Sequence, residues 1–315
     1  MRPVVIAHRG ACGYLPEHTR AAKALAYAMG ADYLEQDVVA SRDDELIVLH
    51  DVHLDRVTDV ASRYPDRARR DGRFYVRDFD LDEIRTLRVS HRRNADGSPV
   101  YPGRAGADGE NLRVLTFAEE LALVRTLETA HGRPVGIYPE IKRPRWHREQ
   151  GVDITPAFLR ILEEYGYSEH LDPVYVQCFD AAELRRIRHQ LGSRLKLVQL
   201  IGENSWQEAA IDFAALRSRR GLQRLARTVD GIGPWINRLY RLPRRSGTVR
   251  STGLVERAHD TGLAVHPYTF RSDDLPPGFD SFGELLTFCT RDLAIDGLFT
   301  DFPDKVLQFL RRIPA

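Results

Sequence analysis

Reactive polar side chains lie in or directly after short apolar runs at three successive places near the start of this chain. The pairs are His8 and Arg9, Glu35 and Asp37, and His50 and Asp51. Each apolar run has the length and composition of a buried β-strand. Polar side chains at the carboxyl ends of successive strands are typical of the active face of a (β/α)8 barrel. The sequence therefore predicts an α/β protein with a TIM-barrel fold and a functional site at one end of the barrel.

The second and third runs are separated by a polar turn, which predicts an antiparallel hairpin. If the turn centres between Asp43 and Asp44, Asp37 lies opposite His50. Glu35 and Asp37 lie on the same side of their strand because strand side chains alternate between the two faces. The spacing predicts a pocket large enough for a metal ion, with an imidazole beside it. A solvated hairpin with scattered acidic residues is the alternative.

A later run, residues 136–141, ends in a second group of charged residues. Glu140 supplies a third carboxylate to join Glu35 and Asp37. Three carboxylates without Cys or His suit a hard cation, Ca²⁺ or Mg²⁺, rather than zinc. Lys142 is one of only four lysines among 46 basic residues. A compact ammonium beside a metal ligand fits contact with a phosphate oxygen, and a lysine without a special role is the alternative.

The composition limits the classes of protein to which the chain can belong. With 315 residues and 43% hydrophobic content, it can bury the core of one barrel with an insertion. Its 46 basic and 45 acidic residues give a net charge of +1, so no overall field attracts nucleic acid or an anionic membrane. No apolar stretch approaches the roughly 18 residues that span a bilayer. Three cysteines are too few, and odd in number, for a disulfide framework.

The rest of the chain alternates predicted helices and strands, as a barrel requires. Helices are indicated by capping and stop signals at 21–29 before Gly30, at 116–130 with a capping box of Thr116 and Glu119, at 155–166, and after Asp180 as far as Gly192. The later strands are expected at 174–177, 195–200, 228–232, 263–266 and 297–300.

Residues 53–113 interrupt this alternation. The segment is rich in Arg and Asp, has a glycine-rich part at 97–109, and shows only one short helical pattern, at 81–87. Its mixed charges favour a solvated surface over a ligand-binding patch.

Eight short motifs occur in order along the chain, within a match that runs from residue 3 to about residue 310. They are His8-Arg9-Gly10, Pro16-Glu17-His18-Thr19, Glu35-Gln36-Asp37, Leu49-His50-Asp51, Pro139-Glu140-Ile141-Lys142, Gln177-Cys178-Phe179, His266-Pro267-Tyr268-Thr269 and Phe299-Thr300-Asp301-Phe302-Pro303-Asp304. Together they resemble the glycerophosphodiester phosphodiesterase family, and most of all its bacterial periplasmic branch. His18 stands where most of the family carries Asn, a departure that suits that branch.

The resemblance implies one TIM-barrel domain over residues 1–315, with the segment 53–113 as an insertion after the second strand. It implies a divalent cation, often Ca²⁺ in the periplasmic branch, with Mg²⁺ as the alternative. The implied reaction is hydrolysis of small glycerophosphodiesters to sn-glycerol 3-phosphate and an alcohol. By likeness, His8 accepts a proton and His50 donates one, although the residues themselves do not distinguish these roles.

Cleavage of a phosphodiester requires that the phosphate is neutralised, a nucleophile deprotonated and a leaving alkoxide protonated. A cation held by Glu35, Asp37 and Glu140 would bind a phosphate oxygen and the attacking hydroxyl. Arg9 and Lys142 would contact the remaining phosphate charge. The attacking group is either the glycerol 2-hydroxyl or water, and the sequence leaves both open.

Further polar residues lie at predicted strand ends or on loops. Glu17 would hold the glycerol hydroxyls or cap the first helix. Gln177, His266 and Tyr268 would line the mouth of the barrel, and Asp301 would cap the last helix. The later strands carry few charges, and no apolar trough for acyl chains is evident. We therefore expect the site to bind glycerol and phosphate, with the leaving alcohol toward solvent or the insertion.

Location and assembly are the least constrained properties. Met1-Arg2-Pro3 leads directly into the first strand, which leaves no room for a signal peptide. The chain is thus expected to be either cytoplasmic or the mature form of an exported enzyme, and the likeness to the periplasmic branch favours the periplasm. A homodimer is compatible with the sequence.

Two rival functions are compatible with a barrel of this kind. One is another barrel phosphodiesterase, of the phospholipase D toxin or phosphoinositide-specific phospholipase C kind, which would need a membrane-facing loop that the sequence does not clearly show. The other is a non-enzymatic surface or binding protein. That role predicts erosion of the reactive residues, whereas all of them are present here.

Overall fold

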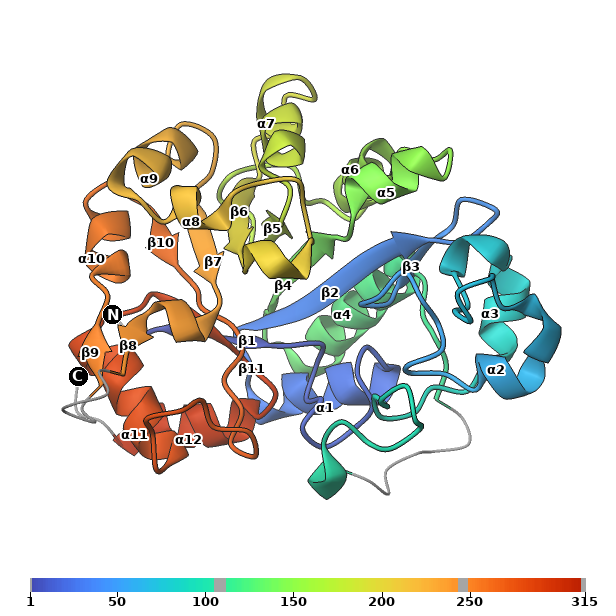
Figure 1. Ribbon diagram of the computed structural model, residues 1–315, viewed down its shortest axis with the longest axis horizontal. Helices are drawn as coiled ribbons and strands as arrows, with labels where there is room; N and C mark the ends of the chain where they lie inside the picture. Colours follow the sequence, from blue (N-terminus) through green and yellow to red (C-terminus); the bar gives the residue numbers. More distant parts are fainter. Residues whose placement is uncertain (1, 105–111, 243–248, 313–315) are drawn as a thin grey trace.

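Among the residues that the computed structural model describes, 2–104, 112–242 and 249–312, eight parallel strands form the centre of the fold (Figure 1). They are β1 (Val4–Ala7), β2 (Tyr33–Ala40), β4 (Gly136–Ile141), β5 (Tyr175–Cys178), β6 (Lys196–Ile201), β7 (Gly231–Pro234), β10 (Ala264–Val265) and β11 (Gly297–Thr300). Their spatial order is β10-β7-β6-β5-β4-β2-β1-β11, and each hydrogen-bonded pair is parallel.

Backbone hydrogen bonds between the segments around β10 and β11 close the sheet. The amide of Asp296 donates to the carbonyl of Val265 (3.1 Å), and the amide of Phe299 donates to the carbonyl of Pro267 (3.1 Å). The amide of Phe270 donates in turn to the carbonyl of Phe299 (2.8 Å). The sheet therefore returns on itself, and the predicted TIM (β/α)8 barrel is confirmed.

Helices on the outside of the barrel cover the strands. The main ones are α1 (Arg20–Met29), α4 (Phe117–His131), α5 (Pro144–Glu149), α6 (Ile154–Glu164), α7 (Ala181–His189), α8 (Phe213–Leu216), α9 (Arg219–Leu225), α10 (Leu254–His259), α11 (Phe282–Thr287) and α12 (Pro303–Arg312). The predicted capping box of Thr116 and Glu119 is present, and Asp180 caps α7 as expected. No helix within the described residues is long and apolar enough to cross a membrane.

The barrel interior is filled by apolar and aromatic side chains. Ile6, Tyr138, Val198 and Phe299 form a cluster there, with Tyr33 and Tyr175 packed against it. A much larger cluster lies between the strands and the surrounding helices, for example where Phe117 of α4 stacks on Phe158 of α6 with ring centroids 5.1 Å apart. The interior is thus a packed core, as in other TIM barrels, and chemistry is confined to the end of the barrel.

The insertion lies beside β3 (Leu46–Val48), on the right of Figure 1, and contains α2 (Val60–Arg63) and α3 (Leu81–Thr86). It has its own apolar cluster, in which Leu54, Phe79 and Ile84 pack against Ile47 of β3. The predicted helix at 81–87 is confirmed as α3. Residues 105–111 of the predicted insertion lie outside the described residues.

The predicted register of the β2–β3 hairpin is wrong by one residue. Val38 pairs with Val48, so Asp37 lies opposite Leu49 rather than His50. The reason is a three-residue loop in which Asp44 adopts the left-handed conformation (φ 64°). Three-residue loops of this type place an αL residue at their end, and the turn then centres on Asp43.

The sixth barrel strand, β7, also begins later than predicted, at Gly231 rather than near residue 228. The amides of Thr228 and Val229 both donate to the carbonyl of Leu225, at 2.8 and 2.9 Å. These bonds extend the last turn of α9, so the apolar residues just after it are not available to the strand.

Candidate active site

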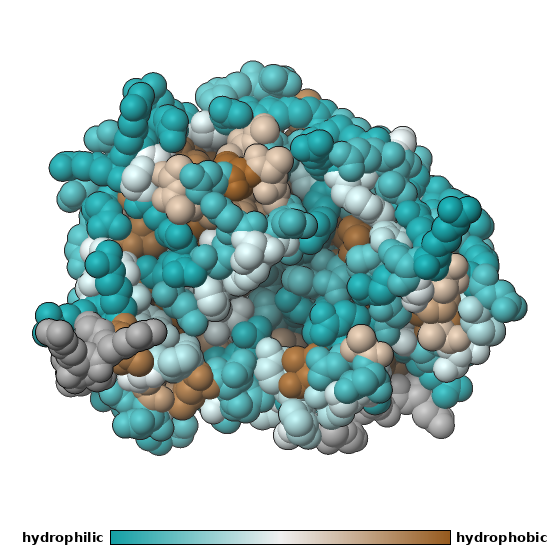
Figure 2. Space-filling view, viewed as in Figure 1, coloured by the Kyte–Doolittle hydropathy of each residue, from teal (hydrophilic) through white to brown (hydrophobic). Residues whose placement is uncertain are grey.

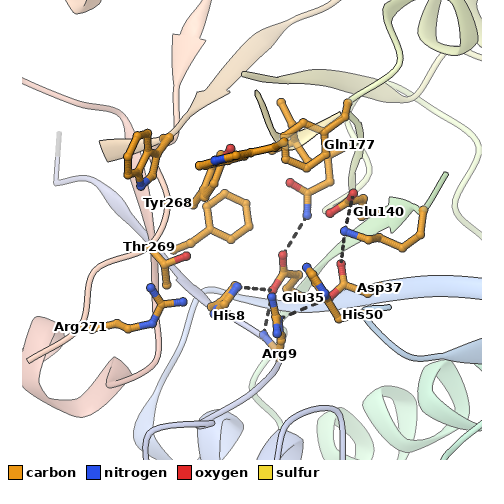
Figure 3. Close-up of a pocket in the computed structure, with 16 residues that line it drawn as sticks. His8, Arg9, Glu35, Asp37, His50, Glu140, Gln177, Tyr268, Thr269 and Arg271 are labelled. Atoms are coloured by element: carbon orange, nitrogen blue, oxygen red, sulfur yellow. Dashed lines mark hydrogen bonds and ion pairs between the residues drawn. The ribbon is translucent and has the colours of Figure 1, made fainter. Parts of the chain in front are cut away.

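One pocket with a volume of about 230 Å³ lies at the carboxyl end of the barrel strands. It opens near the middle of the face shown in Figure 2, where hydrophilic residues surround a hollow. Figure 3 shows its polar side, formed by residues from β1, β2, β4 and the end of the hairpin. These are the seven residues on which the sequence prediction depended: His8, Arg9, Glu35, Asp37, His50, Glu140 and Lys142. The structure therefore brings the predicted set together.

Three carboxylates form the base of this polar side. Glu35, Asp37 and Glu140 each offer an oxygen atom, and these three atoms lie within 4.8 Å of one another. β2 and β4 are adjacent and in a register that pairs Asp37 with Glu140, which is why residues 103 positions apart meet. The amide of Arg9 donates to Glu35 Oε2 (2.8 Å), and Gln177 Nε2 donates to Glu35 Oε1 (3.0 Å).

The electrostatics of these carboxylates fit a bound cation. Burial and the neighbouring Asp37 raise the pKa of Glu35 to about 8, and burial raises that of Glu140. Burial opposes the charge of Asp37 too, but the ammonium of Lys142 holds its pKa well below the usual range. Asp37 Oδ1 is buried without a hydrogen-bond partner. A divalent cation would compensate this excess of negative charge, and the all-oxygen donor set suits Ca²⁺ or Mg²⁺.

Both predicted imidazoles are held by an aspartate. His8 Nδ1 lies 2.6 Å from Asp301 Oδ1, and His50 Nδ1 lies 2.6 Å from Asp51 Oδ1. A carboxylate next to Nδ1 accepts its proton and leaves Nε2 for the pocket. His8 Nε2 indeed lies 4.0 Å from Glu35 Oε2. The sequence thus contains two Asp–His pairs that face one carboxylate cluster.

The assignment of Asp301 to a helix cap is wrong. Its side chain is buried, accepts from His8 and from Arg271 Nε (2.7 Å), and forms an ion pair with Arg104 Nη2 (2.8 Å). The available signal was its position directly after β11, since the other reactive residues also follow strands. Arg271, which lines the pocket, was missed for a related reason: it lies in a loop after β10 that carries no strand pattern.

Burial keeps both histidines neutral in the free protein. It lowers the pKa of His8 to about 4, with the guanidinium of Arg9 acting in the same direction. Burial also lowers the pKa of His50 to about 3, helped by Arg9 and Lys142. A neutral imidazole is ready to accept a proton, whereas a proton donor requires a bound anion to raise its pKa.

The first loop positions Arg9 through an unusual backbone conformation. Arg9 has φ of 58°, in the left-handed region, and Gly10 follows with φ of 93°. A Cβ on Gly10 would approach the carbonyl carbon of Ala22 in α1 to 2.8 Å, so only glycine fits there. The loop therefore packs tightly on α1 while the Arg9 side chain faces the pocket.

Two predicted residues lie away from the pocket. Glu17 is held by Arg9 Nη1 (3.0 Å) and by Arg92 Nη2 (2.6 Å), and it is not part of the pocket wall. It does not cap α1 either, because Thr19 does so. His266 points into the barrel interior, where its Nδ1 lies 2.8 Å from the Tyr138 hydroxyl, so its prediction as a mouth residue is wrong. The ring fills space that small Gly297 leaves open.

The other side of the pocket is more apolar than the sequence suggested. Gln177 and Tyr268 line the pocket as expected. With them stand the apolar residues Phe179, Leu200, Trp206, Trp235 and Phe299. The two indoles meet with ring centroids 5.1 Å apart. The expectation that the pocket has no apolar trough is therefore wrong. One wall of the pocket is compact and largely aromatic, and its residues come from loops and from the ends of the later strands.

The barrel fold and this site define the class of the protein: a TIM-barrel enzyme with paired imidazoles and carboxylates at the carboxyl ends of its strands. The profile of the glycerophosphoryl diester phosphodiesterase family matches residues 8–305, and the chain belongs to that family.

Named relatives cover nearly the whole chain. It is 39% identical to a glycerophosphodiester phosphodiesterase of Haemophilus influenzae, over 98% of this chain and 90% of that protein. It is 37% identical to a glycerophosphodiester phosphodiesterase of Treponema pallidum, over 98% of this chain and 91% of that protein. Among solved structures, a putative glycerophosphoryl diester phosphodiesterase from Silicibacter pomeroyi superposes with a TM-score of 0.73 at 22% identity, covering 98% of this chain and 93% of that one. A phosphodiesterase of Oleispira antarctica in complex with the product sn-glycerol-3-phosphate superposes with a TM-score of 0.64 at 19% identity, covering 98% of this chain and 97% of that one.

Proposed function

We propose that this protein hydrolyses glycerophosphodiesters to sn-glycerol 3-phosphate and an alcohol, by acid–base catalysis with two histidines beside a divalent cation. The observation that carries the proposal is the arrangement of two aspartate-anchored imidazoles around one cluster of three carboxylates. The family membership and the relatives named as glycerophosphodiester phosphodiesterases support the substrate class.

The phosphate would be bound by cationic groups on three sides of the pocket. Glu35, Asp37 and Glu140 would hold a divalent cation, which supplies positive charge to the phosphate oxygens when bound. Lys142, fixed by Glu140 at 2.9 Å, and Arg9 reach the same space from β4 and β1. Arg271 lies on the side of His8 and would contact the oxygen remote from Lys142 (Figure 3).

The two imidazoles would divide proton transfer between them. His8 Nε2, neutral in the free protein, would accept a proton from the attacking hydroxyl, and Asp301 would stabilise the resulting imidazolium. His50 would donate to the leaving alkoxide. The pKa of His50 is low in the free protein, and the negative charge of a bound phosphodiester would raise it. Substrate binding would therefore favour the protonated form of His50 that donates. The assignment of roles to the two histidines rests on family likeness.

The leaving alcohol would lie on the His50 side. A second cavity of about 210 Å³ adjoins His50 and Lys142, between the insertion and α5. Tyr75 of the insertion and Trp146 of α5 stack at its edge with ring centroids 5.9 Å apart. The glycerol moiety would then occupy the aromatic side of the main pocket, where its 2-hydroxyl or a water molecule is the nucleophile. Detection of a cyclic glycerol phosphate in early turnover distinguishes these two.

The test is a coupled assay for glycerol 3-phosphate release from several glycerophosphodiesters, with and without chelator. We expect chelation to abolish turnover and Ca²⁺ or Mg²⁺ to restore it. Without a cation, the three buried carboxylates would repel the anionic phosphate instead of helping to bind it. Full activity in excess chelator, with no metal in the purified protein, would rule out the cation site. Absence of turnover with every substrate and cation would rule out the activity.

We further propose the periplasm as the location and a homodimer as one assembly state, on the likeness to the periplasmic branch. Cell fractionation of the natural host and light scattering of the purified protein test these two points separately.

A further inference from the structure

Two arginines of the insertion lie beside the active site: Arg104, which is paired with Asp301, and Arg92, which is largely buried. Arg92 lies in a loop whose backbone is fixed to the rest of the insertion: the amide of Arg93 donates to the carbonyl of Arg56 (2.9 Å), and the carbonyl of Arg92 accepts from Val100 (3.0 Å). The Arg92 side chain is only 12% exposed. Burying a guanidinium costs free energy unless carboxylates compensate its charge. The carboxylates that Arg92 binds therefore indicate its role.

Arg92 binds two carboxylates that belong to different parts of the site. Its Nε and Nη2 donate to Oε2 and Oε1 of Glu17, at 3.0 and 2.6 Å. Its Nη1 donates to Asp51 Oδ2 at 2.5 Å. The planar guanidinium therefore joins the loop after β1 to the loop after β3, which are 34 residues apart in sequence at these positions, and a lysine could not make the same three bonds.

Each of these carboxylates holds a residue of the pocket. The other oxygen of Asp51 accepts from His50 Nδ1 (2.6 Å), and Glu17 Oε1 accepts from Arg9 Nη1 (3.0 Å). Asp51 is 20% exposed and Glu17 9% exposed, so water does not hold either carboxylate in place on its own. Without Arg92, Asp51 could rotate toward other donors, and His50 would lose its fixed acceptor.

We propose that Arg92 is a positioning residue for the reaction: through Asp51 it fixes the tautomer and direction of His50, and through Glu17 it fixes the Arg9 guanidinium. This inference rests on the proposed function for its kinetic consequences, but the arrangement of His50 can be tested without turnover. The insertion is then a part of the catalytic apparatus rather than only a cover for the barrel.

The kinetic test compares R92M, D51N and E17Q. D51N should lower mainly kcat and E17Q should raise mainly KM, whereas R92M should do both. We expect R92M to lower kcat about 10- to 100-fold, as for outer partners that orient functional imidazoles at metal sites. In the R92M/D51N double variant, kcat should fall no further than in D51N alone, because both changes break the same link.

A matched control separates positioning from stability. Arg67 is another partly buried arginine of the insertion, paired with Glu83 at 2.9 Å and packed over the Phe79 ring, and it contacts neither Glu17 nor Asp51. R67M should lower the unfolding temperature and leave kcat and KM unchanged. If R92M behaves as R67M does, or if R92M and D51N are additive in kcat, Arg92 is structural only.

A spectroscopic measurement is independent of activity. In protein labelled with ¹⁵N-histidine, with His50 assigned by its loss in H50Q, the wild type should show the Nδ1–H tautomer at neutral pH. R92M should show a mixture with the Nε2–H tautomer, while R67M stays as the wild type. An unchanged Nδ1–H tautomer in R92M would overturn the proposal. If the wild type hydrolyses no glycerophosphodiester, the proposed function fails, and the tautomer result still decides the role of Arg92.

Discussion

The two aspartate–histidine pairs of the site show the same chemical arrangement built in two different ways. His8 and Asp301 are 293 residues apart and are nearly inaccessible, with side chains 9% and 1% exposed. His50 and Asp51 are adjacent in sequence and more open, at 27% and 20%. The first pair depends on closure of the barrel, and the second depends on support from the insertion. The buried pair should therefore couple activity to stability, whereas the open pair should affect activity alone.

The largest expected effect is common to both pairs. H8A and H50A should each lower kcat by about 10²- to 10⁴-fold with little change in fold, because in the proposed mechanism each removes one proton-transfer group. Steady-state kinetics with circular dichroism as the check on folding measures this. Turnover like that of the wild type in either variant would remove that histidine from the mechanism.

Replacing the aspartates should separate the two pairs. D301N leaves the buried Arg104 and the partly buried Arg271 without their shared carboxylate, and we expect a loss of about 3 kcal/mol in unfolding free energy besides lost activity. D51N, at a partly exposed site, should lose about 1 kcal/mol or less. Urea unfolding of both variants gives the numbers, and equal destabilisation would break the comparison.

Acid titration should sharpen the description of the buried pair. Burial lowers the pKa of His8, His147 and His266 to about 4 from 6.5. Below pH 6.5 the unfolded chain binds protons that the folded protein excludes, so stability should fall from pH 6.5 to about pH 4, by up to about 3 kcal/mol for each group. The slope of unfolding free energy against pH should be smaller in H8Q. A slope as steep as in the wild type would show that His8 is not held neutral.

The smallest expected effect concerns the open side. Because the cavity beside His50 is partly open, kcat/KM for choline, ethanolamine and glycerol headgroups should agree within about tenfold, or 1.4 kcal/mol. Intact diacyl phospholipids should be poor substrates, since the main pocket of about 230 Å³ has no room for acyl chains. A hundredfold preference for one headgroup, or efficient cleavage of a phospholipid, would contradict this orientation of the substrate.

The sequence predicted the polar side of the site well because each of its residues lies in or directly after a strand. Period-two alternation placed Glu35 and Asp37 on one face, and parallel pairing brought Glu140 beside them. Residues on loops carry no such pattern. Arg92 and Arg271 reach the site from irregular segments, and their positions depend on tertiary packing that no local signal encodes.

The fold was predictable in outline and less so in detail, for similar physical reasons. Capping signals located the start of α4 and α7, because those bonds are local. The predicted hairpin register was off by one residue. The loop places Asp44 in a left-handed conformation, which the residue types of the loop do not specify. The position of His266 was predicted wrongly because β10 is only two residues long. So short a strand does not determine on which side the next side chain lies.

The pairing of β1 with β11, from Val4 with Gly297 to Ala7 with Thr300, brings His8 to Asp301. Contacts between residues so far apart in sequence close the longest loops of the chain and tend to form slowly. Intermediates that lack this last strand pair could already contain the carboxylate cluster and His50, yet His8 would have no partner. Catalytic turnover would then require the closed barrel. The rate at which activity appears during refolding would therefore measure the rate at which β1 pairs with β11.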